Sequence, residues 1–597
     1  MQKRWINRCI AQTHFHISNC CTIMKKTILF SFVSSVFIQL SIAQSHKIVV
    51  PGGAVDPYHY TIEKSKVYTN AAVACAHPLA SAIGSEIMKR GGSAYDAAIA
   101  MQLALAVVYT NAGNIGGGGF LVTKQANGKS FTIDYRETAP AKASKDMYLD
   151  KNGNALSDLS LYGHKACGVP GTVAGLFATL PFAKLPFKTL IQPAIDLAEN
   201  GYVITEREAK NLNDTRKSLV ENSTAPTALV KKNEWKPGDT LVQKELAQTL
   251  KRIRDRGAKG FYEGKTADLI VAEMKKHDGL ISKSDLKNYK AKTRSALEFK
   301  YKDYIVISMA PPSSGGIILC QLMKIMETRP VASYGFQTAK SVQFMVEAER
   351  RAFADRSVYL GDPDYWKVPI KTLTSEAYIQ NRMADYDSTR ATPSSGVKAG
   401  IIKESEETTH ISIIDKEGNM ISITTTLNNS YGSRTVVSGA GFLLNDEMDD
   451  FSIKPGVPNM YGAVGGEANA IQPGKRMLSS MTPTLVLDKN KNPLIVVGTP
   501  GGTTIPTSVF QALINILEFS MNTSEAINKP KFHHQWLPDE VMVEKEFDPE
   551  VRKQLQTMGY TVTERGQIGR MEVIRILPDG RREVASDPRG DDCVNGF

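Results

Sequence analysis

The chain has 597 residues, enough for one large domain or several, and 42% of them are hydrophobic and 22% charged. This composition excludes an intrinsically disordered chain and a polytopic membrane protein. The formal net charge of +11 comes from Lys and Arg residues scattered along the sequence, which indicates an ordinary solvated surface rather than a nucleic-acid-binding face.

The N-terminal region has the three-part pattern of a secretory signal. Met24-Lys25-Lys26 precedes an uncharged, apolar run over 27–43, which ends in the small residues Ser41 and Ala43. The run is short, and serines interrupt it, so it does not resemble a membrane span. We therefore expect translation to start at Met24, residues 1–43 to be removed, and the mature protein to be exported to the periplasm or the extracellular space.

Four cysteines follow this region: Cys75, Cys167, Cys320 and Cys593. Their spacing matches no metal-ligand pattern and favours no particular disulfide pairing, so the sequence leaves open whether any of them pair.

Helical and strand-like segments alternate along the rest of the chain. Residues 71–108 are rich in Ala and carry apolar residues at helical spacing, which predicts helix, and the glycine run 116–119 ends this segment. The residues that follow the glycine run, through Tyr135, have the alternating pattern that is typical of strands. Three further helices are expected at 190–199, 245–256 and 341–359.

A second junction lies in the middle of the chain. Residues 386–407 are rich in Ser, Thr, Pro and charged residues, which predicts a weakly structured segment. It runs directly into two predicted strands, 410–414 and 420–427, joined by a turn. We expect the chain to be processed at this junction.

Thr408 begins the strand that follows the junction. A β-branched residue in this position is in most sequences only a strand former. A threonine that is the first residue of a chain, however, has its own α-amino group beside its hydroxyl as a base. That amine has a reference pKa near ~8, low enough to accept a proton at neutral pH. Cleavage before Thr408 would thus create a nucleophile together with its base.

Other motifs have both an ordinary and a functional interpretation. The acidic run 445–450 is typical of a surface turn. Pro500-Gly501-Gly502, after the apolar strand 494–497, is a turn that could also present two backbone N–H groups to an oxyanion. Arg136 could form a structural ion pair or bind a substrate carboxylate through both arms of its guanidinium. The glycine run 116–119 lacks the Gly-Lys-Ser/Thr ending of a phosphate-binding loop.

From about Val50 to Phe597 the chain resembles the gamma-glutamyltransferase family. The similarity rests on short motifs that occur in one order: Gly116–Phe120, Tyr135-Arg136-Glu137, Gly168–Thr172, Pro312–Gly316, Thr408–Ser412, Gly418-Asn419, Thr424–Asn428, Tyr431-Gly432, Asn445–Phe451, Ser479–Met481, Pro500–Gly502, Phe532–Asp539 and Ala585–Arg589.

The resemblance implies an α+β fold of the N-terminal-nucleophile class, a four-layer αββα sandwich. It also implies that this single domain cleaves itself between Glu407 and Thr408. The products would be a large chain, 44–407, and a small chain, 408–597, which form a heterodimer. No metal or organic cofactor would be needed.

The resemblance further implies a role for each site residue. Thr408 would be the nucleophile, with its amine as general base, Thr426 would assist it by hydrogen bonding, and Gly501 and Gly502 would form the oxyanion hole. The remaining residues would bind the γ-glutamyl group: Arg136, Ser479 and Ser480 its α-carboxylate, Asn428, Glu447 and Asp450 its α-amino group, and Tyr461 at the tip of a lid loop.

The implied activity is hydrolysis or transfer of the γ-glutamyl group of glutathione and related compounds, through a γ-glutamyl ester on Thr408, to water or to an amino-acid or peptide amine. An Arg for a carboxylate and acids for an ammonium would recognise both charged groups of the glutamyl α-carbon. Two alternatives remain: a cephalosporin (glutaryl) acylase of the same superfamily and a catalytically silent binding homologue. Asp450 and Tyr461 favour the transferase over the acylase, and the intact nucleophile and glycine pair argue against the silent homologue.

Overall fold

Strands β12 (Thr409–Ile414) and β13 (Met420–Thr426) form the antiparallel pair that the sequence predicts. The computed structural model describes residues 48–50, 53–397, 408–454 and 466–597, which belong to one compact unit. Every residue of both strands is buried. Apolar and β-branched side chains therefore fill both faces of the pair, as in a sheet that is covered on both sides.

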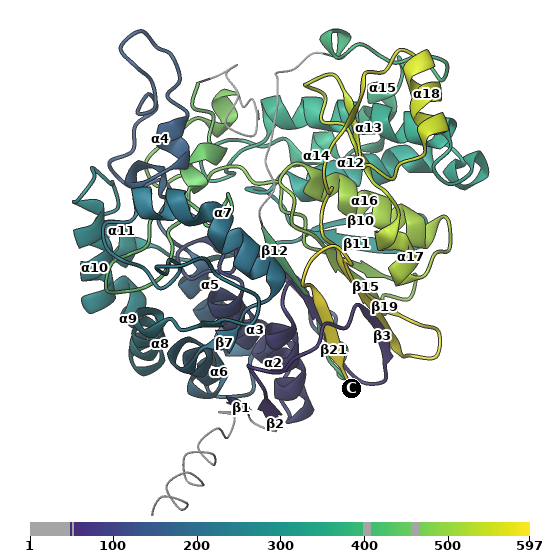
Figure 1. The fold of residues 1–597 in the computed structure, drawn as a ribbon. Coiled ribbons are helices and arrows are strands. Elements are labelled where there is room, and N and C mark those ends of the chain that lie inside the picture. Colours follow the sequence, from purple (N-terminus) through teal and green to yellow (C-terminus); the bar gives the residue numbers. More distant parts are fainter. Residues whose placement is uncertain (1–47, 51–52, 398–407, 455–465) are drawn as a thin grey trace, which may run out of the picture. The chain divides into compact units, whose positions relative to one another are not determined.

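This pair lies at the centre of the first of two seven-stranded sheets, and neighbouring strands within each sheet are antiparallel (Figure 1). In spatial order the first sheet comprises β21 (Cys593–Gly596), β4 (Ala72–Cys75), β12, β13, β5 (Gly118–Lys124), β6 (Ser130–Asp134) and β9 (Lys292–Arg294). The second comprises β10 (Leu297–Tyr301), β11 (Tyr304–Ser308), β14 (Thr484–Leu487), β15 (Pro493–Gly498), β19 (Glu572–Ile576), β20 (Arg582–Ser586) and β3 (Ser65–Tyr68).

The two sheets pack against each other through one set of alternating side chains. Ala74, Phe120 and Met420 of the first sheet share a buried cluster with Leu485 and Val496 of the second. Because successive residues of a strand point to opposite faces, the intervening residues face the helices instead.

Helices cover the outer face of each sheet. Val73 and Ile411 of the first sheet belong to a cluster with helices α2 (Pro78–Lys89), α3 (Ala94–Val108), α6 (Phe187–Asn200) and α8 (Lys244–Arg256). Val306 and Val497 of the second sheet belong to another cluster with α12 (Gly315–Glu327), α13 (Ala339–Tyr359) and α16 (Thr504–Leu517). The layers are thus helix, sheet, sheet and helix, and the predicted αββα sandwich is confirmed.

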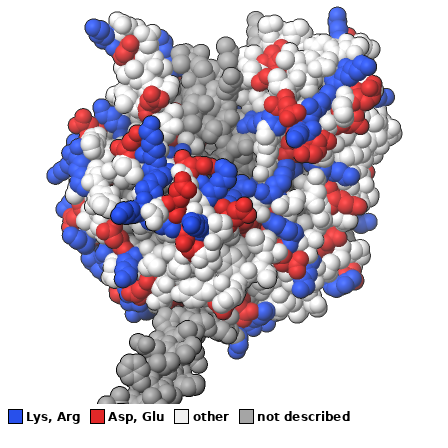
Figure 2. Space-filling model, viewed as in Figure 1, with Lys and Arg blue, Asp and Glu red and all other residues white. Residues whose placement is uncertain are grey.

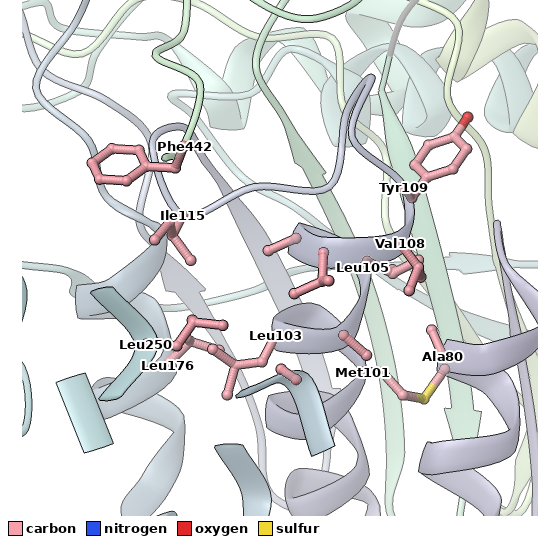
Figure 3. Close-up of a cluster of buried hydrophobic side chains, with 14 of the residues drawn as sticks. Ala80, Met101, Leu103, Leu105, Val108, Tyr109, Ile115, Leu176, Leu250 and Phe442 are labelled. Atoms are coloured by element: carbon pink, nitrogen blue, oxygen red, sulfur yellow. The ribbon is translucent and has the colours of Figure 1, made fainter. Parts of the chain in front are cut away.

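Helix α3 is the central element of the first helical layer. All of its residues are buried, and Met101, Leu103 and Leu105 extend into the cluster that Figure 3 shows. A helix that is apolar on every side is stable only when protein surrounds it. Its start is fixed by a capping box between Ser93 and Asp96.

The structure differs from the sequence interpretation in two segments. Residues 71–108 are not helical throughout, because Ala72–Cys75 form strand β4 and the glycines before Ser93 separate α2 from α3. A four-residue apolar run has no periodicity that distinguishes a strand from a helix.

The helices expected at 190–199, 245–256 and 341–359 are confirmed as α6, α8 and α13.

The second difference is in the segment expected to be weakly structured. Ser394 is fully buried, its hydroxyl donates to the Trp536 carbonyl, and its backbone N–H donates to Asp539 at 2.7 Å. The Trp536 indole N–H in turn donates to the carbonyls of Ser394 and Val397. The motif 532–539 therefore anchors the chain up to Val397, and the remaining residues of the junction, 398–407, lie outside the described part.

On the face seen in Figure 2, Lys and Arg side chains are interspersed with Asp and Glu, as the scattered charges of the sequence predict. Within the described residues, no helix is both long and apolar enough to cross a membrane. The four cysteines after residue 43 are buried and free.

Candidate active site

Thr408 lies immediately before β12 and is 5% exposed. Continuing the register of β12 and β13 by one residue places it opposite Thr426, the last residue of β13. The Thr426 hydroxyl accepts the backbone N–H of Asn428 at 2.8 Å. The fold thus brings the two predicted threonines together at the end of the central strand pair. Glu407, the residue before the predicted cleavage site, lies outside the described part.

Gly501 lines a pocket with Thr408, and Gly502 follows it in the chain. Both glycines have positive φ angles, +135° and +56°, a conformation that side-chain-bearing residues rarely adopt. They lie just before Thr503, the N-cap of α16 (Thr504–Leu517), so their amides are near the positive end of a helix dipole. Among the described residues, neither backbone N–H has a hydrogen-bond acceptor. Two unused donors beside a candidate nucleophile are the arrangement that an oxyanion hole requires.

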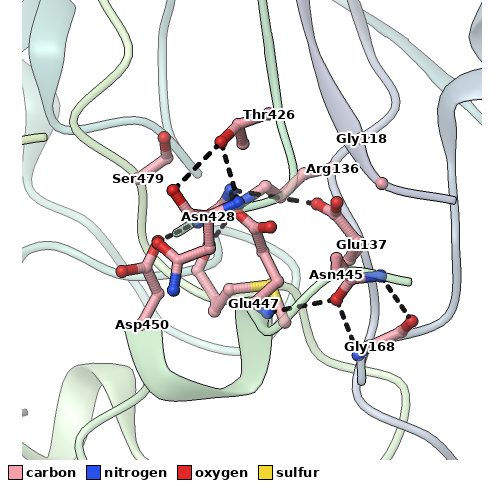
Figure 4. A network of polar contacts seen from close by, with 12 residues as sticks. Gly118, Arg136, Glu137, Gly168, Thr426, Asn428, Asn445, Glu447, Asp450 and Ser479 are labelled. Carbon is pink, nitrogen blue, oxygen red and sulfur yellow. Dashed lines mark hydrogen bonds and ion pairs between the residues drawn. The ribbon is translucent and has the colours of Figure 1, made fainter. Parts of the chain in front are cut away.

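A buried charged network lies close to Thr426 and Asn428 (Figure 4). The two arms of the Arg136 guanidinium donate to Glu447 and Asp450. Both acids belong to a short helical turn, η5 (Glu447–Asp450), whose first backbone N–H is held by the Asn445 side chain at 3.1 Å. The residues expected to bind a carboxylate and those expected to bind an ammonium are therefore paired with each other.

The network contains more acids than cations. Glu137 is fully buried, lies 3.8 Å from the Arg136 guanidinium, and has no hydrogen bond to either carboxylate oxygen among the described residues. Burial raises the pKa of Glu137 to about 8. Burial, with the neighbouring Glu137, also raises the pKa of Glu447, and burial raises that of Asp450. Three carboxylates around one guanidinium thus favour either a bound proton or an additional cation.

Ser479 and Ser480 lie beside this network on the segment before β14. The Ser479 hydroxyl accepts the Met481 backbone N–H at 3.1 Å, and the Ser480 hydroxyl accepts from Arg356 at 3.1 Å. Arg356 belongs to α13, and its positive charge acts on Asp450, with which it lines a pocket.

The structure therefore brings together most of the predicted site residues. Thr408, Thr426 and Gly501 share one end of the central strand pair, and Arg136, Asn428, Glu447, Asp450 and Ser479 gather beside it. Tyr461 lies outside the described residues. The sequence interpretation missed Glu137 and Arg356 as members of the site. Glu137 adjoins Arg136 in a charged motif, whereas nothing in the sequence distinguishes Arg356 from the other charges of its helix.

Comparisons with known proteins agree with this geometry. The family model described as "Gamma-glutamyltranspeptidase" matches residues 80–597. The "Glutathione hydrolase proenzyme" of Escherichia coli (strain K12) is 44% identical over 551 residues, which cover 91% of this chain and 95% of that protein. The crystal structure of Helicobacter pylori gamma-glutamyltranspeptidase has 45% identity and a TM-score of 0.54, over 57% of this chain and 97% of that chain.

Acylases are also similar, at lower identity. "Acylase ACY 1 proenzyme" of Pseudomonas sp. (strain SE83) is 33% identical over 544 residues, 89% of this chain and 94% of that protein. The crystal structure of cephalosporin acylase from Bacillus halodurans has a TM-score of 0.77 over 92% of this chain and 99% of that chain, at 24% identity. At that identity the likeness supports the fold alone.

Proposed function

The chain belongs to the gamma-glutamyltranspeptidase family of enzymes, and from this premise we propose that it transfers or hydrolyses the γ-glutamyl group of glutathione and related compounds, with Thr408 as the nucleophile. The observation that carries the proposal is the position of Thr408, near a buried Arg–acid network and beside two glycines whose backbone N–H groups have no acceptor among the described residues. That combination supplies a nucleophile, an oxyanion hole and a site for a zwitterion.

Maturation would use the same hydroxyl. The Thr408 oxygen attacks the carbonyl carbon of Glu407, the C–N bond breaks as the acyl group moves to oxygen, and water then hydrolyses the ester. The products are a carboxylate on Glu407 and a free amine on Thr408. The α-amino group of Thr408 then accepts the proton of the neighbouring hydroxyl, and its pKa near ~8 suits it to this task. The large chain, 44–407, and the small chain, 408–597, would remain together because both contribute hydrogen-bonded strands to each of the two sheets.

In catalysis, the Thr408 hydroxyl attacks the γ-carbonyl carbon of the donor. The N–H groups of Gly501 and Gly502 would stabilise the oxyanion, and the leaving amine takes the proton. The γ-glutamyl ester is then attacked by water or by an acceptor amine, which regenerates Thr408. Thr426, opposite the nucleophile, would orient its hydroxyl by a hydrogen bond.

The Arg136 network would bind the α-carbon groups of the donor. Arg136, with Ser479 and Ser480, would take the α-carboxylate, while Glu447 and Asp450, with Asn428, would take the α-ammonium. The incoming zwitterion would replace the Arg–acid pairs with pairs to its own charges, so neither protein charge loses its partner. A glutaryl group has no ammonium to offer the two acids, and this favours the transferase over the acylase. Tyr461 would cover the bound substrate.

The region before residue 44 would direct export to the periplasm or the extracellular space. N-terminal sequencing of the exported protein should find a large chain that begins near Gln44, and retention of residues 1–40 would contradict export through this segment.

The activity itself is tested with a γ-glutamyl anilide, assayed with and without a dipeptide acceptor. The proposal expects anilide release in water and faster release when the acceptor is present. A purified, cleaved protein that releases no aniline from this donor would overturn it.

A further inference from the structure

A second group of charged residues lies beside Thr408. The pocket that contains Thr408, Pro500 and Gly501 is also lined by Arg207, Gln567, Gly569 and Arg570. It shares no residue with the network of Arg136, Glu447 and Asp450. Thr408 and Gly501 therefore line a pocket that is separate from the Arg136 network, and the proposed function assigns no role to the two arginines of this pocket.

Arg570 is held rigidly at the wall of this pocket. Its guanidinium donates to the Tyr109 hydroxyl, lies 5.2 Å from the centre of the Tyr109 ring, and is 3.4 Å from Asp592. Its backbone N–H donates to Thr499 at 2.7 Å, directly before the Pro500–Gly502 turn. These contacts fix the arginine before any ligand arrives, which lowers the entropy cost of binding.

Arg207 faces the same pocket from the first turn of α7 (Glu206–Asn222). One nitrogen of its guanidinium donates to the Arg589 carbonyl at 2.7 Å. In the part of the chain that the structure describes, no carboxylate lies within ion-pair distance of Arg207. The pocket thus has one arginine that already has an acidic neighbour and one whose charge is not neutralised.

The reaction determines what this pocket receives. When the glutamyl group occupies the Arg136 network, the scissile carbonyl lies at Thr408 and the leaving amine points away from that network. In a γ-glutamyl peptide, the leaving amine belongs to an amino acid or a short peptide that carries its own carboxylate. An acceptor amine, which attacks from the side where the leaving amine departs, belongs to the same kind of molecule. A guanidinium binds a carboxylate through two parallel hydrogen bonds, which gives direction as well as attraction.

We infer that Arg207 and Arg570 form a subsite for the carboxylate of the leaving or accepting amino acid or peptide, and so determine which amines exchange on Thr408. The inference rests on the proposed function, because it assigns the other half of the same reaction. It predicts a preference for amines that carry a carboxylate over neutral amines of the same shape.

A matched pair of chromogenic donors tests the subsite: γ-glutamyl-p-nitroanilide, whose leaving group is neutral, and the γ-glutamyl amide of aminonitrobenzoic acid, whose leaving group carries a carboxylate. The quantity measured is the ratio of kcat/KM for the carboxylated donor to that for the neutral one. Arg207→Ala and Arg207→Gln should each lower this ratio roughly 10-fold, the loss expected for a charge-assisted hydrogen bond. Arg570→Gln should lower it in the same direction.

Arg216→Ala is the control, because Arg216 belongs to the same helix and its guanidinium also donates to backbone carbonyls, at Asn233 and Lys232. It should leave the ratio unchanged. A reducing gel that shows two chains establishes that each variant has matured. An unchanged ratio in both the Arg207 and the Arg570 variants would overturn the subsite, whereas failure of the wild type on both donors would overturn the proposed function instead.

Discussion

Arg136 and Asp450 form a largely buried ion pair, although 314 residues separate them in the sequence. The pair joins a residue proposed to bind the substrate's α-carboxylate to one proposed to bind its α-ammonium, and each of these two charges compensates the other.

Replacement of Asp450 with Ala should impair γ-glutamyl substrates selectively. Removing one member of a buried charge pair costs about 3–5 kcal/mol, which corresponds to a loss of roughly 10²–10³ in kcat/KM or more. The measurement compares wild type and Asp450→Ala on a γ-glutamyl and a glutaryl anilide. Asp450→Asn is measured beside Asp450→Ala, because it removes the charge and keeps the side-chain volume. An equal loss on both substrates would show that Asp450 has a structural role only.

Replacement of Thr408 should show that self-cleavage of the chain requires the hydroxyl group of this residue. Thr408→Ala has no hydroxyl to attack the preceding carbonyl, so it should remain a single chain and be inactive. Thr408→Ser keeps the hydroxyl and should cleave itself more slowly. Both are read on a reducing gel during incubation of the purified protein. Two chains from the Ala variant would mean that another protease cuts the junction.

Glycine at position 498 is required by the ring of His410. A Cβ added at Gly498 would lie 2.1 Å from the His410 Cε1 atom, and the ring is held by Thr424 at 2.9 Å and by Ser412. Gly498→Ala should therefore reduce the free energy of unfolding by about 1–3 kcal/mol, as overpacking of a core does. Denaturant unfolding measures the change. Gly566→Ala, where an added Cβ meets nothing within 4 Å, should be close to neutral.

The same histidine makes stability depend on pH. Burial lowers the pKa of His410 to about 3, against about 6.5 in an unfolded chain. Between these values the unfolded state binds a proton that the folded state does not, so this contribution to stability is lost as pH falls below about 6.5. The contribution changes by up to about 1.4 kcal/mol per pH unit.

The test compares unfolding of wild type and His410→Gln between pH 7.5 and pH 5.5, values that bracket the ~6.5 of an unfolded histidine. The variant should lose less stability than the wild type as pH falls. His59→Gln is the control, because the His59 side chain is 84% exposed. Identical pH slopes for wild type and His410→Gln would contradict a neutral, buried His410.

The extent to which the sequence predicts the site depends on the kind of contact. The strands on either side of the turn at 415–419 are rich in β-branched residues, so their presence, and the position of Thr408 at the start of the first, follow from local pattern. The position of Thr426 opposite Thr408 follows from the register in the structure. Strand β4 has too few residues for a periodic signal and was assigned to a helix. The pairing of Arg136 with Glu447 and Asp450 depends on how β6 and η5 meet in space, which no local pattern encodes. The same holds for Arg207 and Arg570, which come from an outer helix and a loop before β19.

In the proposed reaction, Thr408 becomes the first residue of a chain and carries the γ-glutamyl group. Mass spectrometry of the small chain, after acid quench of a reaction with a γ-glutamyl donor, tests this most directly. We expect a small chain that spans Thr408 to Phe597, with one added glutamyl residue that fragmentation places on Thr408. A small chain that begins at another residue, or a glutamyl group located on a different side chain, would contradict it.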